Sequence, residues 1–173
     1  LSDKVLADFR EMEKYKDIPE EQKRRSFGIF AKVELESRAE ILYETYAKTL
    51  NIEAMTMIDM ASKQILPAVV KYTKVLADTV VAINGAGADA SVQVELLNEV
   101  TVLLKQAKEA LNHLKAVAEE AMAMSNGKEK AFFYMESVRS AMDALRAPVD
   151  GLEQIVDKHM WPIPTYAELI FEV

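Results

Sequence analysis

The chain has no cysteine, and it has only five glycines and five prolines among its 173 residues. The absence of cysteine excludes a disulfide scaffold and a thiolate metal site, and it is compatible with a reducing cytosol. The scarcity of glycine and proline disfavours an all-β fold, whose many turns need these residues. No apolar run approaches the roughly 20 residues that a membrane-spanning helix requires. The most apolar stretch, residues 75–88, contains Asp78. We therefore expect no membrane partner.

Charged residues make up 28% of the chain and apolar residues 50%, with a net charge of −7. This balance is typical of a soluble globular protein. Acidic and basic residues are interspersed and no basic face stands out, so we expect no nucleic-acid partner. The charged run at residues 20–25 is interpreted as solvated surface, with a site for an acidic partner as the alternative. The length favours a single domain, residues 1–173, and because Leu1 is not a start methionine we expect a piece of a longer protein.

Apolar residues recur at intervals of three and four, which predicts helices along most of the chain. A short first helix is predicted over residues 2–16, with Ser2 as its N-cap. Long helices are predicted over residues 33–84, from Asp89 or Ser91 to about Ser125, and over residues 129–158. The glycines at 85, 87 and 127 mark the stops between them. The third helix has the most regular apolar pattern, formed by Leu97, Val100, Leu104, Ala107, Leu111, Leu114, Ala118 and Ala121.

These elements predict an all-α fold, an up-and-down bundle of three long helices plus a short N-terminal helix. The first helix and a charged connector occupy residues 1–32, the long helices residues 33–158, and an extended C-terminal strap residues 159–173. At about 1.5 Å per residue, the 33–84 helix is roughly 75–80 Å long and the next helix about 55 Å. We expect the first helix, the strap and a surface outside this chain to cover the excess length.

Pro67 and Pro148 lie inside predicted helices. A proline ring clashes with the carbonyl four residues earlier, which is that of Lys63 for Pro67, so we expect a kink at each proline. Asn51 is a second possible break in the 33–84 helix.

The segment that runs Trp-Pro-Ile-Pro from residue 161 ends the helical pattern and contains the only tryptophan of the chain. Its two prolines fix φ and push the residues before them into extended geometry. An apolar strap of this kind must dock on a surface. We expect Trp161 to be substantially buried near the end of the 33–84 helix. The residues to which we assign a structural docking role are Trp161, Pro162, Pro164, Tyr166 and Pro67.

The sequence contains no recognisable catalytic, cofactor-binding or metal site. Glu109 and His113 share a helix face, but no second pair completes a di-iron site, and His159 suits a helix C-terminus. The glycines at 85 and 87 lack the preceding strand and the Lys-Ser/Thr of a phosphate-binding loop. Several methionines and tyrosines are interpreted as packing residues, with a peptide groove or a ligand-stacking row as the alternatives. These are Met55, Met57, Met60, Met122, Met124, Tyr43, Tyr46 and Tyr72.

Two parts of the chain resemble the C-terminal helical region of type III glutamine synthetases. The first part comprises Glu-Ser-Arg-Ala-Glu-Ile-Leu-Tyr-Glu-Thr-Tyr at 36–46, Ile-Glu-Ala at 52–54, Met-Ile-Asp-Met-Ala at 57–61 and Ile-Leu-Pro-Ala-Val-Val-Lys-Tyr at 65–72. The second part comprises Leu-Glu-Gln-Ile-Val-Asp at 152–157, Trp-Pro-Ile-Pro-Thr-Tyr at 161–166 and Glu-Leu-Ile-Phe at 168–171. Order and spacing agree over nearly the whole chain and are weakest between residues 87 and 129.

The resemblance implies a parent enzyme that joins glutamate and ammonia at the expense of ATP, with Mg²⁺ or Mn²⁺, in a bacterial cytoplasm. It also implies a homo-oligomer of stacked hexameric rings. The family's catalytic and metal-binding residues lie in regions that would precede Leu1, so no catalytic residue or cofactor is assigned to this chain. The implied function is that of an accessory, non-catalytic domain, whose partners are the catalytic domain of the same polypeptide and neighbouring subunits. The alternative is a free-standing helical binding or regulatory protein without enzymatic activity.

Overall fold

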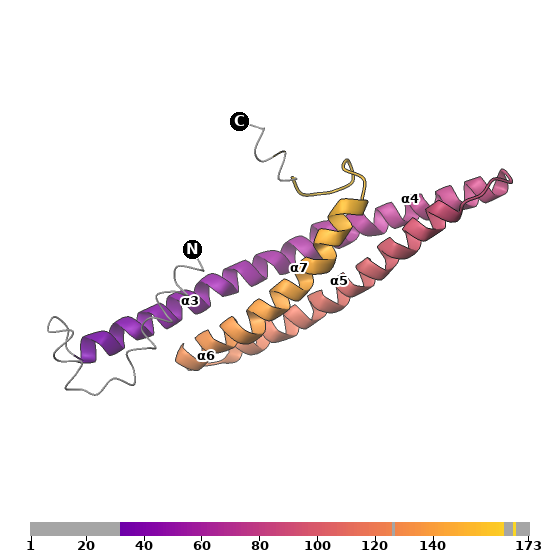
Figure 1. The fold of residues 1–173 in the computed structure, drawn as a ribbon. Coiled ribbons are helices and arrows are strands. Elements are labelled where there is room, and N and C mark those ends of the chain that lie inside the picture. The colour runs from indigo at the N-terminus through magenta and orange to yellow at the C-terminus, as the bar shows by residue number, and fades with distance from the viewer. Residues whose placement is uncertain (1–31, 126, 165–167, 169–173) are drawn as a thin grey trace. The chain divides into compact units, whose positions relative to one another are not determined.

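A computed structural model describes residues 32–125, 127–164 and 168. Within these residues the chain is helical and contains no strand, which confirms the predicted all-α bundle of three long helices (Figure 1). The predicted short N-terminal helix and Tyr166 of the strap lie outside the described residues. The chain divides into two compact units. Of the described residues, unit 1 contains residues 32–54 and those within Val117–Arg139, and unit 2 contains Met55–Ala116, residues 140–164 and Glu168.

The first long helix consists of α3 (Lys32–Met60), a π-helical turn η1 (Ala61–Ile65) and α4 (Leu66–Gly85). Asn51 lies inside α3, so the possible break at this residue is not present. In η1 the Leu66 N–H donates to the Ala61 carbonyl five residues earlier, which is the bonding pattern of a π-helix. Pro67 follows in the first turn of α4. The wider turn gives the proline ring room next to the preceding carbonyls, so the helix continues through Pro67.

The end of α4 is a Schellman motif. The Ala88 N–H donates to the Ile83 carbonyl at 3.1 Å, and the Gly87 N–H donates to the Asn84 carbonyl at 3.0 Å. Gly87 has a φ of 74°, which a residue without a Cβ adopts without strain. The motif closes a short turn between α4 and α5 (Ser91–Ala123). Asp89 then accepts hydrogen bonds from the backbone N–H and the hydroxyl of Ser91, both at 3.0 Å, and fixes the start of α5.

The last long helix consists of α6 (Gly127–Phe133), a second π-helical turn η2 (Tyr134–Val138) and α7 (Arg139–Ile155). Its predicted range of 129–158 was therefore too long at its C-terminal end. Pro148 is buried inside α7. Neither π-helical turn was predicted, because a π-helix differs from an α-helix by one residue in a long apolar pattern.

The interior of each unit is apolar, and among the described residues no polar or charged residue is buried. The predicted stripe on α5 is confirmed, since six of its eight members are buried and Leu97 and Leu104 are partly buried. The core of unit 1 contains Tyr46, Ala47, Leu50, Ala54, Val117, Ala118, Ala121, Ala131, Tyr134 and Val138. The core of unit 2 includes Ala61, Ile65, Leu66, Val69, Leu76, Val100, Ala107, Leu111, Leu114, Leu145 and Leu152. None of the described helices combines the length and the hydropathy of a membrane-spanning segment.

Candidate functional site

The chain after α7 forms a turn organised by Asp157. The Asp157 carbonyl accepts hydrogen bonds from the N–H groups of Met160 at 2.9 Å and Trp161 at 3.0 Å. Its carboxylate accepts the N–H of His159 at 2.7 Å. This turn ends the helical path and begins the strap, so a single aspartate sets the direction in which the strap leaves α7.

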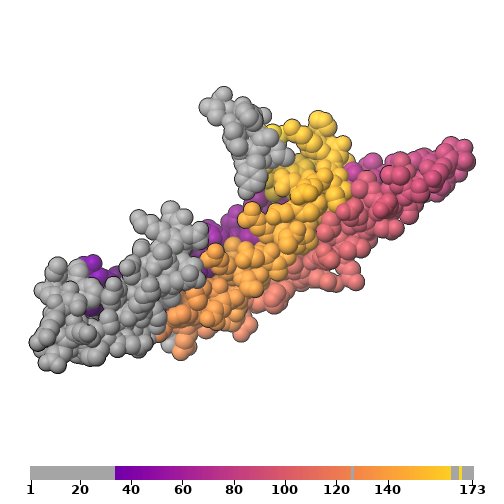
Figure 2. All heavy atoms as spheres, in the orientation of Figure 1, coloured from indigo at the N-terminus to yellow at the C-terminus, as the bar shows by residue number. Residues whose placement is uncertain are grey.

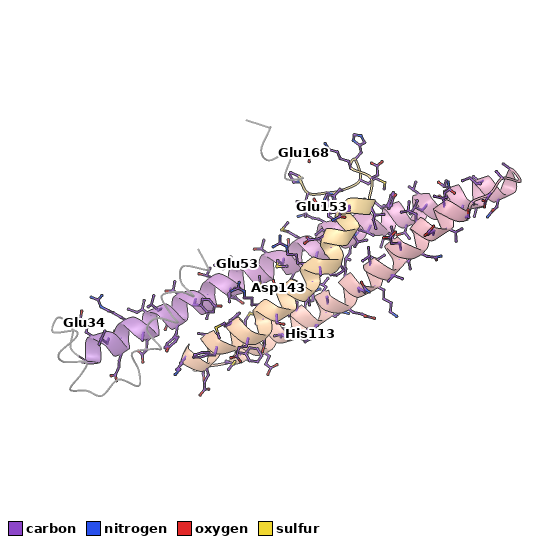
Figure 3. The ribbon with its side chains drawn as sticks, in the orientation of Figure 1. Glu34, Glu53, His113, Asp143, Glu153 and Glu168 are labelled. Atoms are coloured by element: carbon purple, nitrogen blue, oxygen red, sulfur yellow. The ribbon has the colours of Figure 1, made fainter. Side chains whose placement is uncertain are left out.

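Residues 161–164 of the strap alternate between partly buried and exposed positions. Trp161 and Ile163 are partly buried, whereas Pro162 and Pro164 are exposed. This alternation is expected of an extended segment, in which successive side chains point to opposite sides. Farther along, Lys158 Nζ forms an ion pair with Glu168 Oε1 at 3.0 Å; Glu168 is labelled in Figure 3. Of the five residues assigned to docking, the structure therefore gives Trp161 a partly buried position and leaves Pro67, Pro162 and Pro164 exposed.

Tyr72 of α4 lies near the start of the strap. The pKa of its hydroxyl is raised by partial burial and, to a smaller degree, by the negative charge of Asp157. The two residues are far apart in sequence but belong to the same compact unit, unit 2.

Several large apolar side chains are exposed on the described helices. In unit 2 the most exposed lie around the turn between α4 and α5, where Val81 is 72% and Val92 69% exposed. Single exposed apolar residues are common on protein surfaces, but several on one feature mark a candidate interaction surface. The exposed large apolar residues of unit 2 are Met55, Val70, Val75, Val81, Val92, Val94 and Val102.

Comparison with known proteins shows what this helical chain is similar to. The family described as the glutamine synthetase C-terminal domain matches residues 8–84. A glutamine synthetase of Bacteroides fragilis (strain YCH46) is 30% identical over 149 residues, and the type-3 glutamine synthetase of Dictyostelium discoideum is 34% identical over 150 residues. A glutamine synthetase of Butyrivibrio fibrisolvens is 31% identical over 148 residues. The chain is therefore similar to the glutamine synthetase C-terminal domain over residues 8–84. The matches cover 83–84% of this chain and 20–21% of the relatives, so the chain spans about a fifth of their length.

In this chain, the titratable residues weighed from the sequence lie on the surface. Glu109 and His113 are exposed, and Glu109 Oε1 lies 4.0 Å from Lys105 Nζ on the same helix. His159 is exposed in the turn after α7. Among the described residues, no group of three or more histidine, aspartate and glutamate side chains is arranged to hold a metal ion.

The methionines and tyrosines divide between packing and surface positions. Tyr46 is buried and Tyr43 and Tyr72 are partly buried, while Met55 and Met122 are exposed. In unit 1 the rings of Tyr43 and Phe132 lie 6.5 Å apart, and Lys128 Nζ lies 5.5 Å from the centroid of the Phe132 ring. Tyr43 therefore joins α3 to α6.

Two local features of unit 1 were missed from the sequence. Lys130 Nζ donates to the carbonyls of Met122 and Met124, both at 3.2 Å, and so satisfies the C-terminal end of α5. The Tyr134 hydroxyl donates to Asn51 Oδ1 at 2.9 Å. The contact of Lys130 with the end of α5 could have been predicted, because a lysine shortly after a helix end often binds the last carbonyls. Nothing in the sequence indicates that Tyr134 pairs with Asn51.

Proposed function

We propose that this chain is an accessory, non-catalytic helical domain of a type III glutamine synthetase. In this proposal it packs on the catalytic core of the enzyme or on a neighbouring subunit. The observations that carry the proposal are the match of residues 8–84 to a C-terminal domain family and the similarity to glutamine synthetases about four times as long as the chain. The type III assignment follows the name of the Dictyostelium discoideum relative.

The whole protein in this proposal ligates ammonia to glutamate with ATP and Mg²⁺ or Mn²⁺, as a cytoplasmic homo-oligomer in bacteria. The contribution of this chain is structural. Its interior is filled by apolar packing, and its exposed valines and proline strap offer surfaces for contacts with other parts of the enzyme. The nucleotide, the metal ion and glutamate are bound elsewhere in the protein.

Two measurements test the proposal. Isothermal titration of the 173-residue chain with ATP, MgCl₂ and glutamate is expected to give no binding heat, and micromolar binding of any of them would contradict a purely accessory role. The mass of the native gene product, measured by mass spectrometry, is expected to be several times that of this chain. A native product of about this length would instead favour a free-standing helical binding protein.

A further inference from the structure

One packing contact shows which side of the α4–α5 hairpin α7 covers. Gly151 of α7 lies against Leu103 of α5, because a Cβ at position 151 would be 3.4 Å from both Leu103 methyl carbons. The negative charge of Asp157, just after α7, acts on Tyr72 of α4, whose pKa is raised mainly by burial and also by this charge. Leu103 and Tyr72 are 16 and 15 residues from Gly87, so they lie at about the same level of the hairpin.

Beyond this level the hairpin continues without α7. From Tyr72 to Gly85, α4 extends about 20 Å at 1.5 Å per residue. In Figure 1 the hairpin runs past the end of α7, and in Figure 2 its end is not covered by described atoms of α7. We call the part formed by residues 73–102 the tip. The tip is built from two helices, whereas the rest of the hairpin in unit 2 is covered by a third.

The side covered by α7 continues along the tip as an apolar face. On α5, Leu96 and Val92 precede Leu103 by seven and eleven residues, which places all three on one side of the helix. On α4, Val75, Thr79 and Ala82 follow Tyr72 by three, seven and ten residues, so they lie on the same side of the helix as Tyr72. We call this surface the tip face; it consists of Val75, Thr79, Ala82, Val92 and Leu96. Val75 is 48% and Val92 69% exposed, and Leu96 is partly buried.

The charge of the tip is mainly negative. Residues 73–102 contain four acidic residues, Asp78, Asp89, Glu95 and Glu99, and one basic residue, Lys74. Glu95 and Glu99 are exposed on α5 close to the tip face. A second copy of the chain docked tip to tip would bring these acidic residues close to one another, which is unfavourable. An anionic membrane would also repel them. Charge complementarity favours a basic partner.

We propose that the tip face binds an amphipathic α-helix of a protein partner, with an apolar stripe flanked by lysine or arginine. The partner helix lies on the same side of the hairpin as α7, beyond the end of α7, and its basic flanks face Glu95 and Glu99. This inference rests on the proposed docking function and deepens it, because it names the surface and the chemistry of the partner.

The probe is a synthetic peptide of about 18 residues, with leucine at helical spacing of three and four and lysine at the other positions. The matched control peptide carries glutamate in place of lysine. Titrated into the ¹⁵N-labelled chain, the lysine peptide is expected to shift backbone amide signals of the tip selectively. The glutamate peptide is expected to bind at least about tenfold more weakly, a difference of about 1.4 kcal/mol.

Variants of the chain locate the site. Val75→Asp and Val92→Asp are each expected to weaken binding of the lysine peptide at least about tenfold. Val102→Asp is the control, because Val102 is 55% exposed on the same helix but lies about 80° around it from Val92. The double variant Glu95→Gln, Glu99→Gln changes only exposed side chains, so it preserves the fold and is expected to reduce both the affinity and its dependence on salt.

Equal binding of the two peptides, amide shifts spread over the whole chain, or equal losses in the Val92 and Val102 variants would each overturn the proposal. The outcome is separable from that of the proposed function. The proposed function is supported if the chain has no affinity for ATP, magnesium and glutamate and derives from a much longer product. If, in that case, the tip variants do not affect peptide binding, the proposed function stands and only this inference fails.

Discussion

The Tyr134 hydroxyl donates a hydrogen bond of 2.9 Å to Asn51 Oδ1 within unit 1. Tyr134 belongs to the π-helical turn η2 and is 1% exposed, whereas Asn51 lies in the middle of α3 and is partly buried. Burying a hydroxyl without a partner is unfavourable, so this bond makes the buried tyrosine compatible with an otherwise apolar core. It also fixes the register of η2 against α3.

Removing the hydroxyl tests this bond directly. Tyr134→Phe is expected to lower the free energy of unfolding by about 0.5–1.5 kcal/mol, the usual net contribution of a hydrogen bond. The measurement is chemical denaturation followed by circular dichroism. In a double-mutant cycle with Asn51→Ala, the two losses should be less than additive, because each single change already breaks the bond. Additive losses would show that the two side chains contribute independently.

Alkaline pH should destabilise the fold through two tyrosines. Burial raises the pKa of Tyr134 above its usual value of 10.0, and burial together with Asp157 raises the pKa of Tyr72. In the unfolded chain both hydroxyls ionise from about pH 10, while in the folded chain they stay protonated. Their contribution to stability is therefore fully present below pH 10 and is lost as the pH rises through the folded-state pKa values.

Denaturation midpoints measured between about pH 8 and pH 11 check this expectation. The double variant Tyr72→Phe, Tyr134→Phe should lose less stability than the parent chain over this range, since lysine titration affects both proteins alike. An identical decline in the two proteins would mean that neither tyrosine contributes to it.

The helices could be predicted because their signals are local. The stripe from Leu97 to Ala121 repeats at regular spacing and Gly87 follows the end of α4, so the order and type of the elements follow from residues close in sequence. Gly127, predicted as a stop, is instead the first residue of α6, and α5 ends at Ala123. The π-helical turns could not be predicted in this way. Ile65 and Leu66 are both buried, which an α-helical stripe does not require, and only the three-dimensional packing reveals the extra residue.

The candidate surfaces were less predictable. The strap was recognisable from its prolines, and the alternation of Trp161 and Pro162 between partly buried and exposed positions agrees with the extended geometry expected there. The tip face was not recognised, because its valines looked like core residues. Their exposure depends on where α7 ends relative to α4 and α5, and that is a tertiary property that no local pattern encodes.

Pro67→Ala tests how far the proline determines the π-helical turn. Alanine restores one backbone donor, worth about 0.5–1.5 kcal/mol, but it also frees the unfolded chain, which costs about 0.4–1 kcal/mol. Pro67 is exposed, and the buried residues Ile65 and Leu66 hold the register on either side. We therefore expect the free energy of unfolding to change by less than about 1 kcal/mol. A loss above about 2 kcal/mol would show that the packing needs the helix geometry that proline imposes.

Core and surface positions on α5 should differ strongly. Leu111 is fully buried and Leu111→Ala is expected to lower the free energy of unfolding by about 2–5 kcal/mol, through lost apolar burial and the cavity left behind. Val102→Ala, at an exposed site on the same helix, should change it by less than about 0.5 kcal/mol. Thermal and chemical denaturation of the two variants give the comparison, and similar losses would contradict the assigned orientation of α5.

The strap should stabilise the bundle in proportion to how far it is buried. Truncation after His159 is expected to lower the free energy of unfolding by a few kcal/mol, since each fully buried large apolar side chain contributes about 1.5–3 kcal/mol. Trp161 is only partly buried, so Trp161→Ala should account for about 1–2 kcal/mol of that loss. Pro162→Ala serves as the control at an adjacent exposed residue. Tryptophan fluorescence reports the same contact, because its emission should move to longer wavelength on unfolding. If truncation leaves stability unchanged and the emission of the folded chain is already that of a solvated indole, the surface that receives Trp161 lies outside this chain.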